Sequence, residues 1–239
     1  MTMSAEGLGI KIFADGADFS SMLEMSSKKY IKGLTTNPTL MRKAGISDYK
    51  EFSLKVLGEV RDKPISFEVF SDDLSDMQRQ GLEIASWAKN VYVKVPITNT
   101  KGESTAKVID FLVSNGVKVN VTAVMSLKQV QVIVKNLNPE IPSYVSVFAG
   151  RIADTGVDPI PVIKGALEIL SSNKNAELIW ASPRELLNVF QASDVGCHII
   201  TATSDILNKI PLIGMNLEAY SLDTVKMFYR DALDSGYSL

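Results

Sequence analysis

The sequence predicts an α/β fold, namely a single (β/α)8 (TIM) barrel with an additional C-terminal helix. Short apolar runs of strand length alternate with segments of helical periodicity along the whole chain, and eight such runs are present. The length of 239 residues suits such a barrel, and no linker-like or low-complexity tract divides the chain. We therefore expect residues 10–239 to form one barrel domain that includes the C-terminal helix, preceded by a short N-terminal extension over residues 1–9.

Each predicted strand is a short run rich in β-branched and aromatic residues. In chain order the strands are 11–14, 30–34, 64–69, 91–95, 117–121, 144–148, 177–180 and 197–201. Amphipathic segments between the strands predict helices over 48–60, 74–88, 104–114, 127–137, 159–170 and 183–192. A doubly wound open sheet is the competing fold, but it usually has a glycine-rich phosphate loop after its first strand, and Asp15-Gly16-Ala17-Asp18 is not such a loop.

Composition and charge exclude several classes of function. The formal net charge of -2, with both signs interspersed, offers no broad basic face for nucleic acid. No apolar run approaches the roughly eighteen residues needed to span a membrane. Residues 1–9 lack the basic and apolar regions of a signal peptide, so we expect a cytoplasmic protein.

Cysteine and histidine are too scarce for a disulfide or a histidine-rich metal centre. The chain has one of each, Cys197 and His198, and both stand in an apolar strand pattern that favours a packing role. We therefore expect no metal and no cofactor. Cleavage of a carbon–carbon bond beside a carbonyl needs an electron sink, and an iminium formed on a lysine is the sink that side chains can provide.

Polar residues stand at the end of nearly every predicted strand. The reactive groups of a (β/α)8 barrel gather at the carboxyl ends of its strands, so this ring is a candidate site. A single such residue would be an ordinary cap or turn former. In chain order the ring contains Asp15, Thr35, Thr36, Asn37, Glu68, Lys94, Asn120, Thr122, Ser146, Ser182, Thr201 and Thr203.

Lys94 is the only charged residue in the apolar run 91–96. A lysine buried without an anion has a depressed pKa and becomes a nucleophile toward carbonyl carbon, whereas a lysine on an edge strand keeps its ammonium in water. Lys118 is a rival because it has the same strand parity as Asn120 and Thr122. It stands at the entrance of its strand, the end of a barrel that usually serves stability, so Lys94 is preferred.

With these residues in view, the chain resembles a transaldolase of the short form related to fructose-6-phosphate aldolase. The matching stretches run through most of the chain, and the Thr-Thr-Asn-Pro element is the most specific of them. They are 14–16, 33–40, 67–69, 93–96, 120–122, 146–152 and 181–184. The resemblance implies a (β/α)8 barrel and the class I Schiff-base chemistry of the pentose phosphate pathway.

The resemblance also implies a reaction and a role for each matching residue. A dihydroxyacetone unit would pass from a ketose phosphate, sedoheptulose 7-phosphate or fructose 6-phosphate, to glyceraldehyde 3-phosphate or erythrose 4-phosphate. Lys94 matches the Schiff-base lysine, and Asp15 the carboxylate that takes the proton from the C4 hydroxyl. The remaining matches are Glu68 and Thr122 for water and proton transfer, Asn37 and Asn120 for the hydroxyls of the three-carbon fragment, and Ser146 and Phe148 for the wall beside it; Thr35 is a further substrate-binding residue.

An anion pocket is expected after the sixth and seventh strands. Arg151, Ser182 and Arg184 match the family's phosphate site, and a guanidinium fork fits phosphate oxygens well. The chain departs from the family here, because Pro183 stands where an aromatic residue is common and Val147 replaces a frequent proline. Proline at the first helical position, with Ser182 as a cap, is compatible with a helix start.

Two other functions remain as alternatives. A fructose-6-phosphate aldolase would share the lysine and release free dihydroxyacetone, but it typically has glutamine and tyrosine where this chain has Glu68 and Phe148. A noncatalytic barrel that binds sugar phosphates is the second alternative, since fold alone does not fix function. Such a protein would have no need for a buried lysine.

The C-terminal segment 221–233 predicts an amphipathic helix beyond the eight βα units. Its apolar residues are Leu222, Val225, Phe228, Tyr229 and Leu233. Such a stripe can pack on its own barrel. In short transaldolases a comparable helix reaches across a subunit boundary, so a homo-oligomer formed through this helix is the other interpretation.

Overall fold

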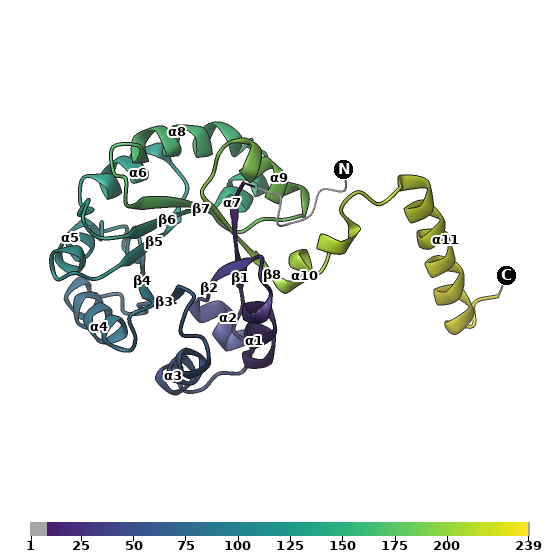
Figure 1. The fold of residues 1–239 in the computed structure, drawn as a ribbon, viewed down its shortest axis with the longest axis horizontal. Coiled ribbons are helices and arrows are strands. Elements are labelled where there is room, and N and C mark those ends of the chain that lie inside the picture. Colours follow the sequence, from purple (N-terminus) through teal and green to yellow (C-terminus); the bar gives the residue numbers. More distant parts are fainter. Residues whose placement is uncertain (1–8, 239) are drawn as a thin grey trace.

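Eight parallel strands close into a barrel in the order β1-β2-β3-β4-β5-β6-β7-β8, as the computed structural model shows (Figure 1). The structure describes residues 9–238, so residues 1–8 of the predicted N-terminal extension lie outside the described residues. The (β/α)8 fold predicted from the sequence is confirmed. The strands are β1 Lys11–Asp15, β2 Ile31–Thr35, β3 Ile65–Glu68, β4 Val91–Pro96, β5 Val119–Val124, β6 Ser143–Val147, β7 Ala176–Trp180 and β8 Ile199–Thr203.

Helices between successive strands surround the barrel (Figure 1). The six helices expected from periodicity are present as α3 Tyr49–Glu59, α4 Leu74–Ser86, α5 Ala106–Ser114, α6 Leu127–Val134, α8 Ile160–Leu170 and α9 Leu187–Asp194. The others are α1 Phe19–Ser27, α2 Pro38–Lys43, α7 Ala149–Asp154, α10 Ser204–Leu207, the 3-10 helix η2 Ile210–Leu212 and α11 Leu217–Asp234. The expected helix start at Pro183 with Ser182 as its cap is wrong, because α9 begins four residues later and Ser182 has φ 60°.

Strands β5 and β8 begin two residues later than predicted, and the preceding helix explains the difference. The N–H of Val117 donates to the carbonyl of Leu112 in α5, and that of Cys197 donates to Ala192 in α9. These bonds belong to Schellman-type ends of the helices. The N–H groups of Val117 and Cys197, the first residues of the two predicted strands, therefore bond to the end of a helix and not to the sheet.

Short helices α1 and α2 have local start signals that apolar periodicity does not reveal. The Asp18 carboxylate accepts the N–H of Ser21 at the start of α1. The Asn37 side chain accepts the N–H of Leu40 at the start of α2, where Pro38 takes a first-turn position. Side-chain caps of this type satisfy backbone donors that a helix leaves free.

The interior of the barrel has an aromatic floor beneath its carboxyl end. Inward-facing residues of five strands form this floor, and the Tyr92 and Tyr144 rings stack with centroids 4.0 Å apart. The floor consists of Phe13, Tyr92, Tyr144, Ile179 and Ile199. Because side chains alternate along a strand, the next inward residue toward the carboxyl end of each strand lies above the floor.

Gly33 makes room for the floor, and its substitution gives a stability prediction. A Cβ at this position would lie 2.6 Å from the Phe13 ring. We expect Gly33→Ala to lower the free energy of unfolding in urea by about 1–3 kcal/mol, because the rigid ring must move within a packed barrel. Gly58→Ala is the matched control, since that Cβ meets nothing within 4 Å and alanine favours the helix. Equal stability of the two variants would contradict this account.

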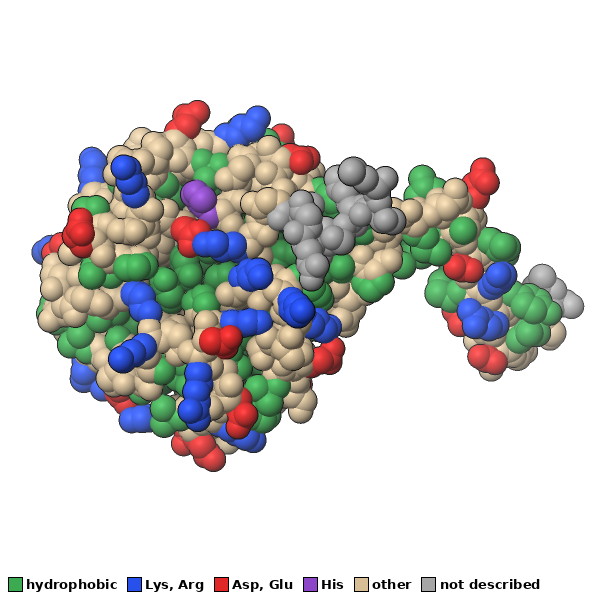
Figure 2. All heavy atoms as spheres, in the orientation of Figure 1, with side chains coloured by type: hydrophobic (Ala, Val, Ile, Leu, Met, Phe, Trp, Pro, Cys, Tyr) green, Lys and Arg blue, Asp and Glu red, His purple; other side chains and the backbone are tan. Residues whose placement is uncertain are grey.

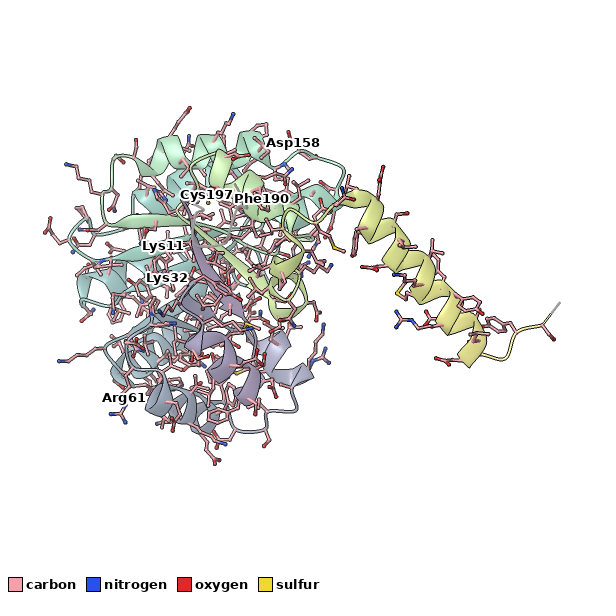
Figure 3. The ribbon with its side chains drawn as sticks, turned by 45° about the vertical axis from the view of Figure 1, so that its right-hand side comes forward. Lys11, Lys32, Arg61, Asp158, Phe190 and Cys197 are labelled. Atoms are coloured by element: carbon pink, nitrogen blue, oxygen red, sulfur yellow. The ribbon has the colours of Figure 1, made fainter. Side chains whose placement is uncertain are left out.

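Helix α11 extends away from the barrel in both ribbon views (Figures 1 and 3). None of its residues is buried, and Phe228 is 61% exposed. Figure 2 shows hydrophobic side chains along this arm, whereas charges of both signs are scattered over the visible barrel face. The interpretation that the helix packs on its own barrel is therefore wrong, and its apolar stripe stays uncovered by the described residues.

Cys197 lies in the core just before β8 (Figure 3). Burial raises the pKa of its thiol to about 12, so the thiol is protonated and inert at neutral pH. The neighbouring His198 accepts the N–H of Leu178 at Nδ1, at 2.9 Å. Cys197 thus has the packing role expected from the sequence, whereas His198 is exposed and the expectation of a packing role is wrong for it. Within residues 9–238, none of the helices has the length and apolar character that crossing a membrane would require.

Candidate active site

A pocket of about 500 Å³ opens at the carboxyl ends of the strands. Of the residues to which the resemblance gave a role, all except Asn120 line it, and Thr36 of the predicted polar ring does not line it either. Those that line it are Asp15, Thr35, Asn37, Glu68, Lys94, Thr122, Ser146, Phe148, Arg151, Ser182 and Arg184. Thr201 and Thr203 of β8 line it as well, so the closed barrel brings side chains from all eight strands and their loops to one cavity.

Lys94 points from β4 into this pocket with only 7% of its side chain exposed. Its Nζ donates to the Thr36 carbonyl at 3.1 Å and lies 3.2 Å from Glu68 Oε2. The parallel register of β3 and β4 sets Glu68 directly opposite Lys94. The amine is therefore buried, as expected, but it has an anionic neighbour, and that carboxylate can accept the proton that the amine must lose before it attacks a carbonyl.

Tyr49 fixes the backbone of Glu68 from outside the barrel. Its hydroxyl donates to the Glu68 carbonyl and accepts the Glu68 N–H, both at 2.8 Å. Burial raises the pKa of the Tyr49 hydroxyl, so it stays protonated and can make both bonds. The Glu68 carboxylate therefore projects from a strand end whose backbone is fixed by two hydrogen bonds.

Asp15 lies at the end of β1 with one carboxylate oxygen held by a chain of threonines. Thr35 Oγ1 donates to Asp15 Oδ1 at 2.7 Å and lies 2.6 Å from Thr201 Oγ1. Because Thr35 has one hydroxyl hydrogen, Thr201 donates to Thr35. Burial raises the pKa of Asp15, while the Lys94 charge and the Thr35 bond oppose that rise. A carboxylate with a raised pKa is a stronger base toward a sugar hydroxyl.

Asn120 is buried beneath the pocket and does not line it. Its Nδ2 donates to Ser66 Oγ at 2.9 Å, and its Oδ1 accepts from Ser146 Oγ at 2.7 Å. Both ends of the amide are thus engaged with protein, so in this geometry it orients Ser146. Asn37, by contrast, lines the pocket and uses its oxygen as the cap of α2, which leaves its Nδ2 for a ligand.

Thr122 provides a buried hydroxyl without a hydrogen-bond partner among residues 9–238. The register between β5 and β6 shifts between Val121 and Val124. Within the shift, Ala123 has φ 60°, a left-handed conformation that costs energy for a residue with a Cβ. Strained backbone of this kind clusters at functional sites. Here it lies next to the Thr122 hydroxyl, which can form a hydrogen bond with substrate or water.

Arg151, Ser182 and Arg184 form the cationic end of the pocket. Arg184 Nη1 donates to Ser182 Oγ at 3.0 Å, and its Nε donates to Asp154 Oδ1 at 2.9 Å. Hydrogen bonds from Arg184 lower the pKa of Asp154 and in turn raise the pKa of Arg184. Asp154 was not predicted; its position three residues after Arg151 in a short helix is the only signal that the sequence offers.

Lys118 lies on the other side of the aromatic floor. Its Nζ is 4.9 Å from the centroid of the Tyr92 ring and donates to the Lys89 carbonyl. It does not line the pocket. The preference for Lys94 therefore agrees with the geometry. Lys43 of α2 does line the pocket and was missed, because α2 itself has no periodic pattern.

The comparisons with known proteins agree with this geometry. The family model described as "Transaldolase/Fructose-6-phosphate aldolase" matches residues 12–235. The chain belongs to this family. A "Probable transaldolase" of Sulfurihydrogenibium sp. (strain YO3AOP1) is 34% identical over 90% of this chain and 96% of its own length. Another of Thermoanaerobacter sp. (strain X514) is 32% identical over the same shares.

Solved structures support the fold. One described as "Native KDPGal structure" has a TM-score of 0.54 and 12% identity, and the match covers 81% of this chain and 82% of the other. A likeness at this identity concerns the barrel alone. Membership of the family therefore rests on the sequence matches.

Proposed function

We propose that this protein is a transaldolase that transfers a dihydroxyacetone unit from a ketose phosphate to an aldose phosphate through a Schiff base on Lys94. The donors would be sedoheptulose 7-phosphate or fructose 6-phosphate, and the acceptors glyceraldehyde 3-phosphate or erythrose 4-phosphate. The observation that carries the proposal is the buried Lys94 amine, 3.2 Å from Glu68, in a pocket that Asp15 also lines.

Schiff-base formation begins with attack of Lys94 Nζ on the C2 carbonyl of the donor. Glu68 first accepts the proton that the ammonium loses, so that the neutral amine attacks. A second proton passes from the nitrogen to the carbonyl oxygen to give the carbinolamine, which must lose its hydroxyl as water to become an iminium. Glu68 returns the proton to that leaving hydroxyl. The free Thr122 hydroxyl supports this step because it can hold the departing water.

Carbon–carbon cleavage then requires a base at the C4 hydroxyl. The Asp15 carboxylate takes this proton, the C3–C4 bond breaks, and its electron pair moves into the iminium to give an enamine on Lys94. The C4 carbon leaves as an aldehyde. The acceptor aldehyde reverses these events, Asp15 returns the proton, and hydrolysis of the new iminium releases the product ketose.

Transfer is favoured over release of free dihydroxyacetone by two pocket residues. Release needs a proton on the enamine carbon, and Phe148 offers no hydroxyl that could donate it. Glu68, an acid, stands where the aldolases typically have glutamine, and it pairs with Lys94. The cationic end formed by Arg151 and Arg184 supports a phosphate on both donor and acceptor.

Borohydride reduction in the presence of fructose 6-phosphate, followed by peptide mass spectrometry, tests the proposal. We expect a stable adduct on the peptide that contains Lys94. Adding erythrose 4-phosphate should make turnover depend on the acceptor, whereas acceptor-independent release of dihydroxyacetone would indicate an aldolase. The absence of any adduct would indicate a binding protein and overturn the proposal.

We further propose that α11 binds a second copy of this chain. Its stripe of Leu222, Val225, Phe228, Tyr229 and Leu233 is uncovered by the described residues. Exposed apolar area of this kind is unfavourable in water and marks an interaction surface. The arm projects from the barrel (Figure 1), so a partner of the same sequence can receive it without rearrangement of the donor barrel.

Sedimentation equilibrium of the full chain tests this assembly. We expect an oligomer for the wild-type protein and for Ala219→Glu, which adds a charge on the polar side of α11. Val225→Glu places the same charge in the apolar stripe and should shift the population to monomer, with a dissociation constant raised by about a hundredfold or more. A monomeric wild-type protein would contradict the proposal.

A further inference from the structure

Arg184 is held on two edges by groups of this chain. Its Nε donates to Asp154 Oδ1 at 2.9 Å, and its Nη2 donates to the second carboxylate oxygen. Its Nη1 donates to Ser182 Oγ at 3.0 Å. A guanidinium has five N–H groups, so these contacts leave one N–H on each Nη nitrogen for a ligand in the pocket that Arg184 lines.

Asp154 does not line the pocket, and an exposed ion pair usually contributes little to stability. Its side chain is 52% exposed, and that of Arg184 is 46% exposed. The bidentate geometry, however, fixes the plane of the guanidinium, which is what recognition of a phosphate requires. The contact is therefore better suited to orientation than to stability.

Ser182 provides a second reason for a positioning device at this end of the pocket. It has φ 60°, a strained conformation for a residue with a side chain. Because its Oγ accepts from Arg184, its own O–H hydrogen remains available for an anion. The Arg184 contact thus orients the hydroxyl as well as the guanidinium.

Helix α7 and the loop after β7 are packed backbone to backbone at the same place. A Cβ on Gly150 would lie 1.6 Å from the Ser182 carbonyl oxygen. The turn that contains Ser182 and Arg184 therefore packs directly against α7, the helix that contains Asp154. Arg151, also from α7, lines the pocket and has no ion pair among residues 9–238, although its charge contributes to the lowered pKa of Asp154.

We propose that Asp154 is a positioning residue for recognition of phosphorylated sugars. By holding Arg184 in one plane it directs the two remaining N–H groups and the Ser182 hydroxyl toward the substrate phosphate, while Arg151 adds a positive charge that has no ion-pair partner among residues 9–238. The inference depends on the proposed function, because the phosphate is that of the donor and the acceptor. It assigns to a residue outside the pocket a part in choosing phosphorylated over unphosphorylated acceptors.

Steady-state kinetics of the full chain with matched acceptors test the inference. For Asp154→Ala we expect KM for glyceraldehyde 3-phosphate to rise about tenfold, with kcat within about twofold of wild type. The parameters for unphosphorylated glyceraldehyde should not change. Asp154→Glu, which restores a carboxylate, should bring KM back to within about threefold of wild type. Asp110→Ala, which removes an exposed carboxylate on α5, is the control for net charge and should behave as wild type.

Three outcomes would overturn the assignment. A lower KM for the phosphorylated acceptor in Asp154→Ala would mean that Asp154 only screens Arg184. An equal loss with both acceptors would mean a general structural role, and an unchanged KM would mean none. The urea midpoint of each variant shows whether a loss of activity comes from unfolding.

Binding of inorganic phosphate separates this inference from the proposed function. Calorimetric titration needs no turnover, and we expect Asp154→Ala to bind phosphate about tenfold more weakly than the wild type and Asp110→Ala. If the wild type formed no Schiff base but the variant still lost phosphate affinity, the transferase proposal would fail and the positioning role would stand. Equal phosphate affinity in both, or none in the wild type, would overturn the positioning role.

Discussion

Lys94→Ala is expected to abolish both the borohydride adduct and the transfer of dihydroxyacetone. The reaction needs a covalent electron sink, and the other lysine of similar strand parity, Lys118, lies across the aromatic floor. We expect kcat/KM to fall by about a thousandfold or more, since loss of a nucleophile removes the covalent pathway itself. Peptide mass spectrometry after reduction with fructose 6-phosphate measures the adduct, and a coupled assay measures transfer.

The same substitution removes the partner of a mostly buried carboxylate. Only 17% of the Glu68 side chain is exposed, and breaking such a pair can cost about 3–5 kcal/mol. The double variant Lys94→Met, Glu68→Gln removes both charges and retains similar volumes, so it should unfold closer to the wild type. It must also be inactive if Lys94 is the nucleophile.

Lys118→Ala is the matched control for the Lys94 prediction. It should retain the adduct and nearly full activity, with an effect confined to stability through the lost contact with Tyr92. If Lys94→Ala folded and kept its activity, or if the adduct appeared on Lys118, the chemistry would have to be reassigned.

Strand parity is the reason why so much of the site could be predicted from the sequence. Side chains alternate between the two faces of each strand, so every second residue faces the interior of the barrel. Lys94, Asn120 and Ser146 occupy such inward positions on three neighbouring strands. The carboxyl-end rule for barrels then gathers them into one region. Neither step needs a coordinate, and the observed pocket contains nearly all of the predicted residues.

Pairwise partners could not be predicted in the same way, because they depend on register and on loop conformation. The parallel register sets Glu68 beside Lys94, and it sets Asn120 within reach of Ser66 and Ser146. A shift of one residue would turn every side chain to the other face. The family resemblance gave Asn120 a substrate role, which stays a prediction; in this geometry one N–H of its amide bonds to Ser66 and its oxygen accepts from Ser146.

The short helices and the position of α11 could not be predicted from the sequence for another reason. A helix of six residues such as α7 has too few turns to show an apolar period, so the sequence places Asp154 close to Arg151 but does not indicate its contact with Arg184. For α11 the amphipathic pattern was visible, but a pattern reports which face must be covered and not what covers it. The structure shows that its own barrel does not.

Asp15→Asn is expected to separate Schiff-base formation from carbon–carbon cleavage. Lys94 and Glu68 remain, so the variant should still give a borohydride adduct with fructose 6-phosphate. That adduct should retain the whole sugar phosphate, because the carboxylate assigned to the C4 hydroxyl proton is gone, whereas the wild type should also give the three-carbon fragment. We expect kcat to fall by about a hundredfold to ten-thousandfold. A three-carbon adduct formed at the wild-type rate would show that another group is the base.

Stability should move in the opposite direction in this variant. Burial raises the pKa of Asp15 above that of the same carboxyl in the unfolded chain. The folded protein therefore holds this proton more tightly, and the wild type loses stability as the pH rises from the unfolded pKa through the raised folded pKa. Asparagine carries no charge at any pH and can still accept the Thr35 bond. We expect Asp15→Asn to unfold at a higher urea concentration than the wild type near neutral pH, with the difference fading in acid. A variant that is less stable than the wild type at neutral pH would mean that attraction to Lys94 outweighs the cost of burying the carboxylate.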